Sequence, residues 1–318
     1  MYSLALPSKH GYSIQFSPYL PDRIACAGCQ NYGILGSANV FIIDIAASNL
    51  VINKVFNWNN AIFDICWSEC NENLLIGAGG DGSLLVYDVK QNTENPVRVF
   101  REHEKEVYSV HWNQTRQHQM ILTASWDFSV KMWDVLSSSE SSIATFRHSQ
   151  AVIYDAQWSP FNAQQFLSVT GAGSGFIWDT RSNQAPAVAL AKQETEILSC
   201  DWCKYDVNVV VTASTDGVIR VWDVRSPNRC TCELVGHEMA IRRVKFSPFS
   251  PNKIISASYD FTVKTWNFQQ QPSPLETFKH HTEFVYGLTC NLHKPGIVAD
   301  CSWDRTIKVY QCNSIIQK

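Results

Sequence analysis

The chain has 318 residues, more than an ordinary single domain and fewer than three domains would need. Charged residues make up 17% and aromatic residues 12%, a balance that favours a β-rich, well-buried fold. The net charge of −3 argues against nucleic acid or an anionic membrane as the main partner, and no apolar run approaches the roughly 20 residues of a membrane span. The start "MYSLALPSKHGY" also lacks the basic segment and the long apolar core of a secretory signal.

Strand-like segments that end in a polar residue recur along the chain at a nearly constant period. In chain order they are "FIID" ending at Asp44, "VYD" at Asp88, "MWD" at Asp134, "IWD" at Asp179, "VWD" at Asp223, "TWN" at Asn267 and "VYQ" at Gln311. The gaps between these end points are 44, 46, 45, 44, 44 and 44 residues, which makes seven copies. A fixed period of this length decides the fold, because it is typical of repeat architectures.

Each copy contains the same elements in the same order. An alternating first strand, such as "VYSVHW" (107–112), precedes a second strand that runs into an acidic turn. The turn residues are Asp81, Asp127, Asp216, Asp260 and Asp304. The third strand ends at the positions given above, and a weaker fourth strand follows, such as "VRVF" (97–100). Four short strands per copy, joined by turn-forming residues, are typical of propeller blades.

The sequence therefore predicts one all-β domain, 1–318, folded as a seven-bladed β-propeller. We expect the blades at approximately 9–57, 58–102, 103–147, 148–192, 193–236, 237–280 and 281–318. Too few residues follow the last copy to give a confident fourth strand there. We expect residues 1–8, with "YSLAL", to supply the outer strand of the last blade and to close the ring.

These motifs resemble the WD-repeat family over essentially the whole chain. The resemblance implies a buried hydrogen-bond network of a His, the turn Asp, a Ser or Thr and a Trp. The matching residues are His103, Asp127 and Trp133 with Thr123 or Ser125; His237, Asp260 and Trp266; and His281 and Asp304 with Tyr310 in place of Trp. Copies four and five depart from the pattern at Ala172 and Gln193, so we expect their blades to be less tightly held.

The repetition of these His and Asp residues in blade after blade indicates a scaffold. We therefore predict no catalytic residue, no metal site and no cofactor, and the chain is not expected to be an enzyme. The two histidines in "HHTEF" (280–284) are also interpreted as part of the scaffold and not as a metal site. Eleven scattered cysteines, with the spaced pairs Cys26/Cys29 and Cys200/Cys203, are typical of reduced thiols in a cytosolic protein.

One face of the ring collects the candidate binding residues. The residues before strand one and the turn after strand two share a face, which we call the top face. We expect a peptide-binding site there, with Trp126, Tyr259 and Trp303 exposed around the central channel. The other candidates are Trp58, Asp64, Glu104, Glu106, Glu194, Glu196, Glu238, Glu283 and Phe284. Carboxylates mixed with rings fit a ligand that is basic and apolar, such as a short amphipathic helix; alternatively, each Glu only solvates its loop and each ring packs on a neighbouring blade.

Several stretches resemble one branch of this family, the peroxisomal import receptors for type 2 targeting signals. They are "FSPYLPDRIACA" (16–27), "EILSCDWCKYD" (196–206), "IRRVKFSPF" (241–249), "SYDFTVK" (258–264), "HHTEF" (280–284) and "VADCSWD" (298–304).

This resemblance implies a receptor that shuttles between cytosol and peroxisome. It would bind cargo such as peroxisomal thiolase through an N-terminal signal of pattern basic-aliphatic-x5-His/Gln-aliphatic. It would act with a co-receptor and a peroxisomal docking complex, and it would neither bind nucleic acid nor insert into the membrane. A generic WD-repeat scaffold or substrate adaptor, in a ubiquitin ligase or a chromatin complex, remains the alternative.

Overall fold

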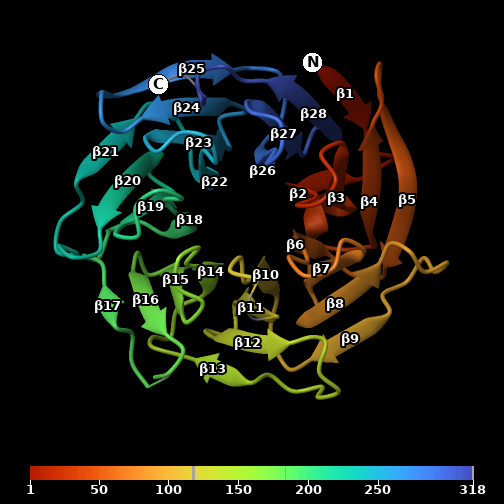
Figure 1. Cartoon of the computed structure of the whole chain (residues 1–318), viewed down its shortest axis with the longest axis horizontal. Helices are drawn as coiled ribbons and strands as arrows, with labels where there is room; N and C mark the ends of the chain where they lie inside the picture. The colour runs from red at the N-terminus through yellow and green to blue at the C-terminus, as the bar shows by residue number, and fades with distance from the viewer. Residues whose placement is uncertain (117–118, 183, 317–318) are drawn as a thin grey trace.

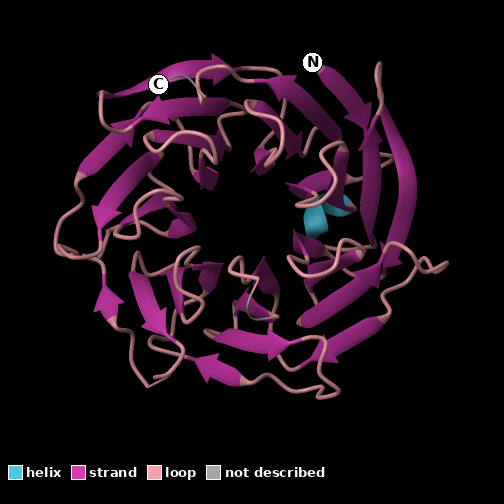
Figure 2. Cartoon of the chain, in the orientation of Figure 1, coloured by secondary structure: helices cyan, strands magenta, loops and turns pink. Residues whose placement is uncertain are grey.

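The computed structural model describes residues 1–116, 119–182 and 184–316. Seven four-stranded antiparallel sheets are arranged as blades around a central axis (Figure 1). The described part of the chain contains one helix, the short 3-10 turn η1 (Asn31–Gly33) (Figure 2). No helix within the described ranges is long and apolar enough to cross a membrane.

The first four blades are built from consecutive strands, with the innermost strand first. Blade 1 has β2 (His10–Phe16), β3 (Arg23–Cys29), β4 (Ala38–Ile45) and β5 (Leu50–Trp58). Blade 2 has β6 (Ile62–Trp67), β7 (Leu74–Gly79), β8 (Ser83–Asp88) and β9 (Arg98–Arg101). Blade 3 has β10 (Val107–Trp112), β11 (Met120–Ser125), β12 (Val130–Asp134) and β13 (Ala144–Phe146). Blade 4 has β14 (Ile153–Trp158), β15 (Gln165–Thr170), β16 (Gly175–Asp179) and β17 (Val188–Ala189).

The last three blades follow the same plan until the ring closes. Blade 5 has β18 (Ile197–Trp202), β19 (Val209–Ser214), β20 (Val218–Asp223) and β21 (Cys232–Val235). Blade 6 has β22 (Ile241–Phe246), β23 (Lys253–Ser258), β24 (Val263–Asn267) and β25 (Gln271–Phe278). Blade 7 has β26 (Val285–Cys290), β27 (Ile297–Ser302) and β28 (Thr306–Gln311), with β1 (Tyr2–Ala5) as its outer strand.

Ring closure joins the two ends of the chain in one sheet. Strand β1 pairs antiparallel with β28, and Tyr2 lies opposite Val309. The backbone N–H of Leu6 adds a 2.7 Å hydrogen bond to the carbonyl of Arg305. The all-β, seven-bladed propeller closed by the N-terminal strand is therefore confirmed, and the closure covers an edge of β28 that would otherwise be free to pair with another chain.

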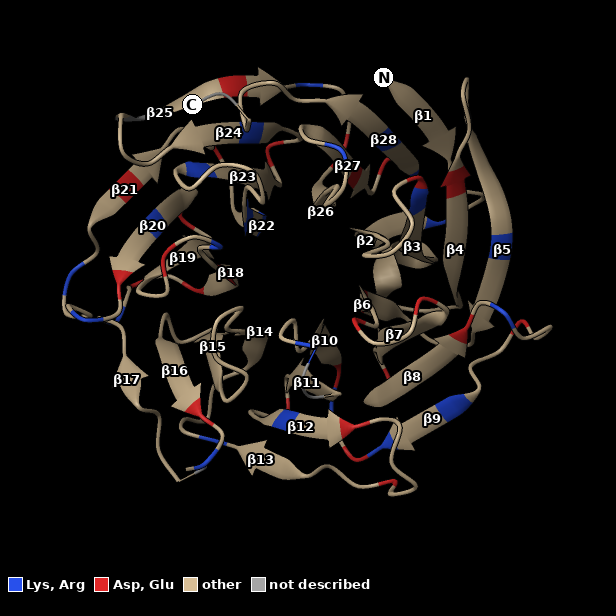
Figure 3. Cartoon of the chain, in the orientation of Figure 1, with Lys and Arg blue, Asp and Glu red and all other residues tan. Residues whose placement is uncertain are grey.

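The hydrophobic core is divided among the seven blade interfaces. One cluster lies between each pair of neighbouring blades; between blades 2 and 3, for example, Ile76 and Phe100 pack with Trp112 and Trp133. The acidic residue that ends the third strand lies outside this core in blades 1 to 5, at the arrowheads of β4, β8, β12, β16 and β20 (Figure 3). The blades are thus wedges of alternating strands that hold the loops of the two faces in fixed positions.

Candidate functional site

Backbone hydrogen bonds fix the geometry of the top face. In most blades, the residue after strand two donates its N–H to the carbonyl of the residue before strand one. The pairs include Trp126 to Glu106 at 3.0 Å, Thr215 to Glu196 at 2.9 Å, Tyr259 to Ala240 at 3.0 Å and Trp303 to Phe284 at 3.0 Å. These bonds place each turn residue beside the entrance to the innermost strand. Glu106 and Glu196 are consequently the two predicted acids nearest the channel.

A side-chain network behind each turn holds this arrangement in blade 3. His103 Nδ1 lies 2.7 Å from Asp127 Oδ2, and His103 Nε2 lies 2.7 Å from the hydroxyl of Thr123, which accepts the indole N–H of Trp133 at 2.8 Å. Burial lowers the pKa of His103, so it is a neutral donor to Asp127. Burial opposes the ionisation of Asp127, but hydrogen bonds from His103 and neighbouring groups outweigh it and hold its pKa below the ordinary value.

This network reaches the top face through the backbone. Asp127 Oδ2 also accepts the backbone N–H of Glu104 at 3.2 Å, and in blade 6 Asp260 accepts that of Glu238 at 3.1 Å. The blade 6 network otherwise repeats that of blade 3, with His237, Ser256 and Trp266 in the same roles. The networks therefore hold the backbone of two predicted binding residues at the channel mouth.

Blade 7 carries a charged form of the same network. Its second-strand position holds Asp300 where blades 3 and 6 hold a hydroxyl. The two ring nitrogens of His281 lie 2.7 Å from Asp304 Oδ2 and 2.8 Å from Asp300 Oδ1, so both must donate. Burial disfavours the imidazolium, but the two carboxylates outweigh burial and raise the pKa of His281 to about 9. His280 and Tyr310 each contact Asp300 Oδ2 at 2.9 Å, and the cluster of His280, His281 and Asp300 is thus a closed hydrogen-bond network.

The two departures from the repeat pattern have different consequences. In blade 4, where Ala172 replaces the turn Asp, the Trp178 indole still donates to the Ser168 hydroxyl at 2.9 Å, and this is the one bond of the network among the residues that the structure describes. In blade 5, Gln193 donates to Thr212 at 3.2 Å and accepts from Ser214 at 2.6 Å and from Arg220 at 2.9 Å. The expectation of a loosened network in blade 5 is wrong, because the amide both donates and accepts where the imidazole would.

The six predicted glutamates surround the mouth without cationic partners. Glu104, Glu194, Glu196, Glu238 and Glu283 are exposed and Glu106 is half-buried. None of them forms an ion pair within the described residues. Glu196 Oε2 accepts the hydroxyl of Tyr154 at 3.2 Å, its one side-chain hydrogen bond in that part of the chain. Carboxylates that are exposed and form no ion pair are available to a cationic ligand.

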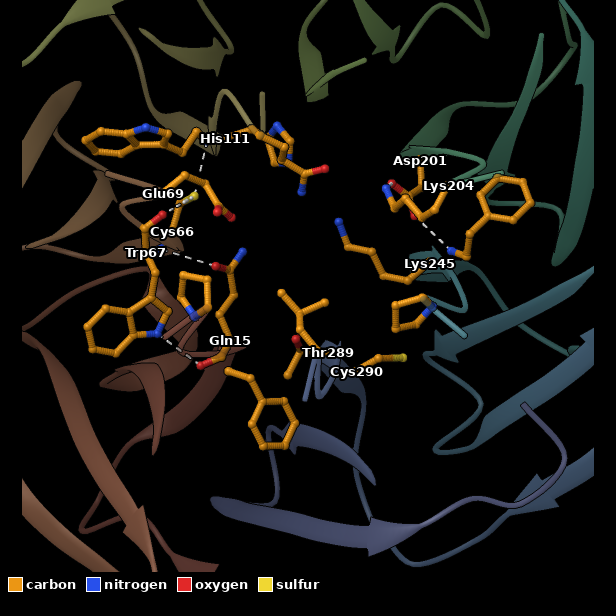
Figure 4. Close-up of a pocket in the computed structure, with 17 residues that line it drawn as sticks. Gln15, Cys66, Trp67, Glu69, His111, Asp201, Lys204, Lys245, Thr289 and Cys290 are labelled. Carbon is orange, nitrogen blue, oxygen red and sulfur yellow. Dashed lines mark hydrogen bonds and ion pairs between the residues drawn. The ribbon is translucent and has the colours of Figure 1, made fainter. Parts of the chain in front are cut away.

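The opposite mouth of the channel is different in character. A cavity of about 120 Å³ opens there between the far ends of the innermost strands (Figure 4). Its acids are already paired, since Glu69 contacts Arg116 at 3.1 Å and Asp201 contacts Lys204 at 2.8 Å. Lys245 also points into this cavity (Figure 4). A basic peptide is therefore favoured by the top mouth and not by this one.

The predicted aromatic residues are at the top mouth, but they are half-buried. Trp126 stacks on Tyr108 with ring centroids 5.3 Å apart, and Trp303 stacks on Tyr286 at 5.2 Å. Tyr259 stacks on Phe284 at 4.5 Å. The expectation of freely exposed rings is corrected accordingly. Rings from the innermost strands support them from below, so each presents only part of its surface.

A second ring of residues beneath these was missed in the sequence. All seven innermost strands have a register shift after their first residues, which marks a β-bulge. The residue at each bulge has no partner in the strand register, and two of these residues, Tyr108 and Tyr286, stack on tryptophans of the mouth. The set, which we call the inner ring, is Tyr12, Phe63, Tyr108, Tyr154, Leu198, Arg242 and Tyr286. Aligning the first strands of the seven copies would have found it, because five of the seven residues at this place are aromatic.

Two predicted site residues do not belong to the mouth. Asp64 is 3% exposed, and its carboxylate is occupied by the Ser13 hydroxyl at 2.6 Å, the Val110 N–H at 3.2 Å and the Arg243 guanidinium at 3.1 Å. It lies below the inner ring and belongs to the scaffold. Trp58 ends β5, the outermost strand of blade 1, where the Arg101 guanidinium lies 5.7 Å from its ring.

The mouth is more acidic on one side and more apolar on the other, although Glu238 and Glu283 precede blades 6 and 7 on the more apolar side. Four of the six glutamates lie on blades 3 and 5. Blades 1 and 6 carry exposed apolar residues of the top face: Ile34 and Leu35 are 79% and 74% exposed in the turn after β3, and Met239 and Phe261 are 44% and 38% exposed. A helix about 10 Å across that lay over the mouth would meet both sides at once. The surface of the mouth is therefore of a kind that suits a basic, amphipathic helix.

Comparison with known families agrees with the fold. The model described as "WD domain, G-beta repeat" matches residues 94–134, 189–223, 228–267 and 272–311. The matched segments, which make up just under half of the chain, are thus similar to WD repeats. The structure places them in a seven-bladed β-propeller whose candidate site lies at one mouth of the channel.

Similarity to individual proteins is narrower in extent. The chain is 48% identical over 121 residues to the mouse (Mus musculus) "Peroxisomal targeting signal 2 receptor", which is 38% of each protein. It is 48% identical over 120 residues to the human (Homo sapiens) protein of the same name, covering 38% of this chain and 37% of that one. It is 40% identical over 111 residues to "Peroxisome biogenesis protein 7" of Arabidopsis thaliana, 34% of this chain and 35% of that one. The matched segments thus span about two fifths of these relatives or less, and they confirm the resemblance found in the sequence.

Proposed function

We propose that this propeller is a receptor for N-terminal type 2 peroxisomal targeting signals, and that the signal binds as an amphipathic helix at the top mouth. The observation that carries the proposal is the mouth itself, with unpaired glutamates on one side and supported rings and exposed aliphatics on the other. The names of three similar proteins support the same receptor class. The role is binding, not catalysis.

The spacing of the signal suits this mouth. In the pattern basic-aliphatic-x5-His/Gln-aliphatic, the two aliphatic residues are seven positions apart and stack on one side of a helix. They would rest on Trp126, Trp303 and Tyr259, while the basic residue meets Glu106 or Glu196. Each aliphatic contact contributes about 1.5–3 kcal/mol and each exposed ion pair about 0–1 kcal/mol. Ordering a short peptide costs a few kcal/mol in return, so binding would be weak without a second protein.

The proposal therefore includes partners. A co-receptor would complete the clamp on the signal, and cargo such as peroxisomal thiolase would be carried from the cytosol to a docking complex on the peroxisome. The chain would contact neither nucleic acid nor the membrane interior. In a pulldown from cytosol, thiolase among the captured proteins would support the receptor, and capture of histones or ubiquitin-ligase subunits instead would support an adaptor.

The direct test measures the affinity of the chain for a labelled type 2 signal peptide in the presence of its co-receptor. Reversing both inner acids, Glu106→Lys with Glu196→Lys, replaces attraction by repulsion and should weaken binding about tenfold or more. Trp126→Ala should weaken it by a similar factor because an aliphatic contact is lost.

The matched control is Glu72→Lys, which reverses an exposed acid in the loop between β6 and β7 on the opposite face. Its affinity should equal that of the wild type. Thermal melts of all variants check that they fold. Wild-type affinity in the folded Glu106→Lys, Glu196→Lys variant would refute the site.

A further inference from the structure

Arg242 is the one charged residue of the inner ring, and it is 1% exposed. Its three guanidinium nitrogens have no hydrogen-bond partner among the described residues. The guanidinium instead lies over two tyrosine rings, 4.9 Å from the centroid of Tyr108 and 4.8 Å from that of Tyr286. The hydroxyls of these tyrosines are 2.8 Å apart, so the two rings close around the cation.

The stack extends outward to the tryptophans of the mouth. Trp126 lies on Tyr108 at an interplanar angle of 23°, and Trp303 lies on Tyr286 at 11°. A continuous series of planes, Trp126–Tyr108–Arg242–Tyr286–Trp303, thus links blades 3, 6 and 7 beneath the mouth. Each tryptophan is thus connected to the cation at the centre through one tyrosine ring.

Burying this cation costs stability, and the surroundings do not neutralise it. The nearby Asp64 carboxylate is already held by Arg243 at 3.1 Å. Stacking between two rings compensates in part, and a planar guanidinium can stack in this way whereas the ammonium of lysine cannot. A positive charge also remains fixed directly below the rings that the ligand would touch.

We propose that Arg242 is a specificity-determining residue that decides which side chains of the bound signal reach the centre of the mouth. It holds Trp126 and Trp303 in place for aliphatic side chains, and its charge repels cationic ones toward the glutamates at the rim. Rings without this cation would instead attract lysine through cation–π contacts. The inference rests on the proposed function and names a residue that selects the side chains of the signal at the centre of the mouth.

The test compares two signal peptides that differ at one mouth-facing aliphatic position, which is replaced by Met or by Lys. The wild-type chain should bind the Met peptide about tenfold or more tightly than the Lys peptide. Arg242→Met should weaken binding of the Met peptide severalfold and reduce its advantage over the Lys peptide to about twofold or less. Arg242→Lys keeps the charge without the stack, so it should weaken binding and retain the preference.

The matched control is Arg225→Met, which removes an exposed arginine that pairs with Asp223 on the opposite face, and it should change neither affinity nor preference. A purely structural role of Arg242 would lower both affinities equally and leave their ratio unchanged, which would overturn the inference. The wild-type comparison needs no variant, and equal binding of both peptides would also overturn it. If the wild-type chain binds neither peptide, the proposed function is refuted and the inference falls with it.

Discussion

The blade 7 network predicts that His281 is a cation at neutral pH whereas His103 and His237 are neutral. Two carboxylates face the two ring nitrogens of His281, at 2.7 Å and 2.8 Å, so each nitrogen must carry a proton. In blades 3 and 6 one ring nitrogen faces a hydroxyl, and burial lowers the pKa of both histidines. Asp300→Ser would replace the second carboxylate of blade 7 by a hydroxyl, as in blades 3 and 6, and this substitution therefore tests the prediction.

The magnitude follows from the pKa of His281, which rises from 6.5 to about 9 on folding. A raised pKa means that the folded state holds the proton more tightly. The resulting stability is fully present below about pH 6.5 and is lost as pH rises through about 9. The rise in the pKa of His281 on folding corresponds to on the order of 3 kcal/mol of stability. His103 and His237 act in the opposite sense, because a lowered pKa removes stability as pH falls below 6.5.

Two measurements check this prediction. Side-chain ¹⁵N spectra near neutral pH should show the doubly protonated signature for His281 and the neutral form for His103 and His237, and Asp300→Ser should make His281 neutral. Denaturant melts should show that Asp300→Ser destabilises the protein most at mildly acidic pH and progressively less toward pH 9. A neutral His281 in the folded wild type, or a destabilisation that does not change with pH, would refute the reasoning.

Two further predictions concern the scaffold. Deleting residues 1–6 removes β1 and the buried Leu6 from blade 7. The deletion should lower the free energy of unfolding by about 3 kcal/mol or more, measured by melts, and should increase aggregation through the uncovered edge of β28, measured by light scattering. An unchanged melting temperature would contradict ring closure by β1. Gly173 has φ +75°, and a Cβ there would lie 2.2 Å from the carbonyl oxygen of Gln193. Gly173→Ala should therefore lower the free energy of unfolding by about 1–3 kcal/mol, measured by thermal melts, whereas the control Ala172→Ser should leave it nearly unchanged. Equal melting temperatures of the two variants would show that the turn accommodates the added Cβ without strain.

The repeat period is enough to predict the fold, because each copy contains the whole blade pattern within about 44 residues. Closure by residues 2–5 could be predicted as well, since the last copy lacks a strand. The acids of the top face could be placed from their positions before strand one. These are local features, in which spacing along the chain determines position in the blade.

Contacts across the channel could not be predicted in this way. Asp64 accepts a hydrogen bond from Arg243, which is 179 positions away in the chain, so a comparison of the repeats cannot predict that Asp64 is buried. The aromatic residues of the inner ring recur in the repeat, but the contact of Arg242 with the rings of Tyr108 and Tyr286 on other blades could not be predicted from that repetition. Gln193 shows a third limit, because a residue that breaks the motif can still supply the same hydrogen bonds.

Photo-cross-linking maps the bound signal most directly. A type 2 signal peptide carrying a photoreactive side chain at one of its aliphatic positions would be irradiated with the intact chain and co-receptor, and the adducts located by mass spectrometry. We predict adducts on the top mouth, at Trp126, Trp303 or the Ile34–Leu35 turn. Adducts confined to the opposite mouth near Lys245, or to the outer strands of the blades, would contradict the assignment of the signal to the acidic and aromatic face.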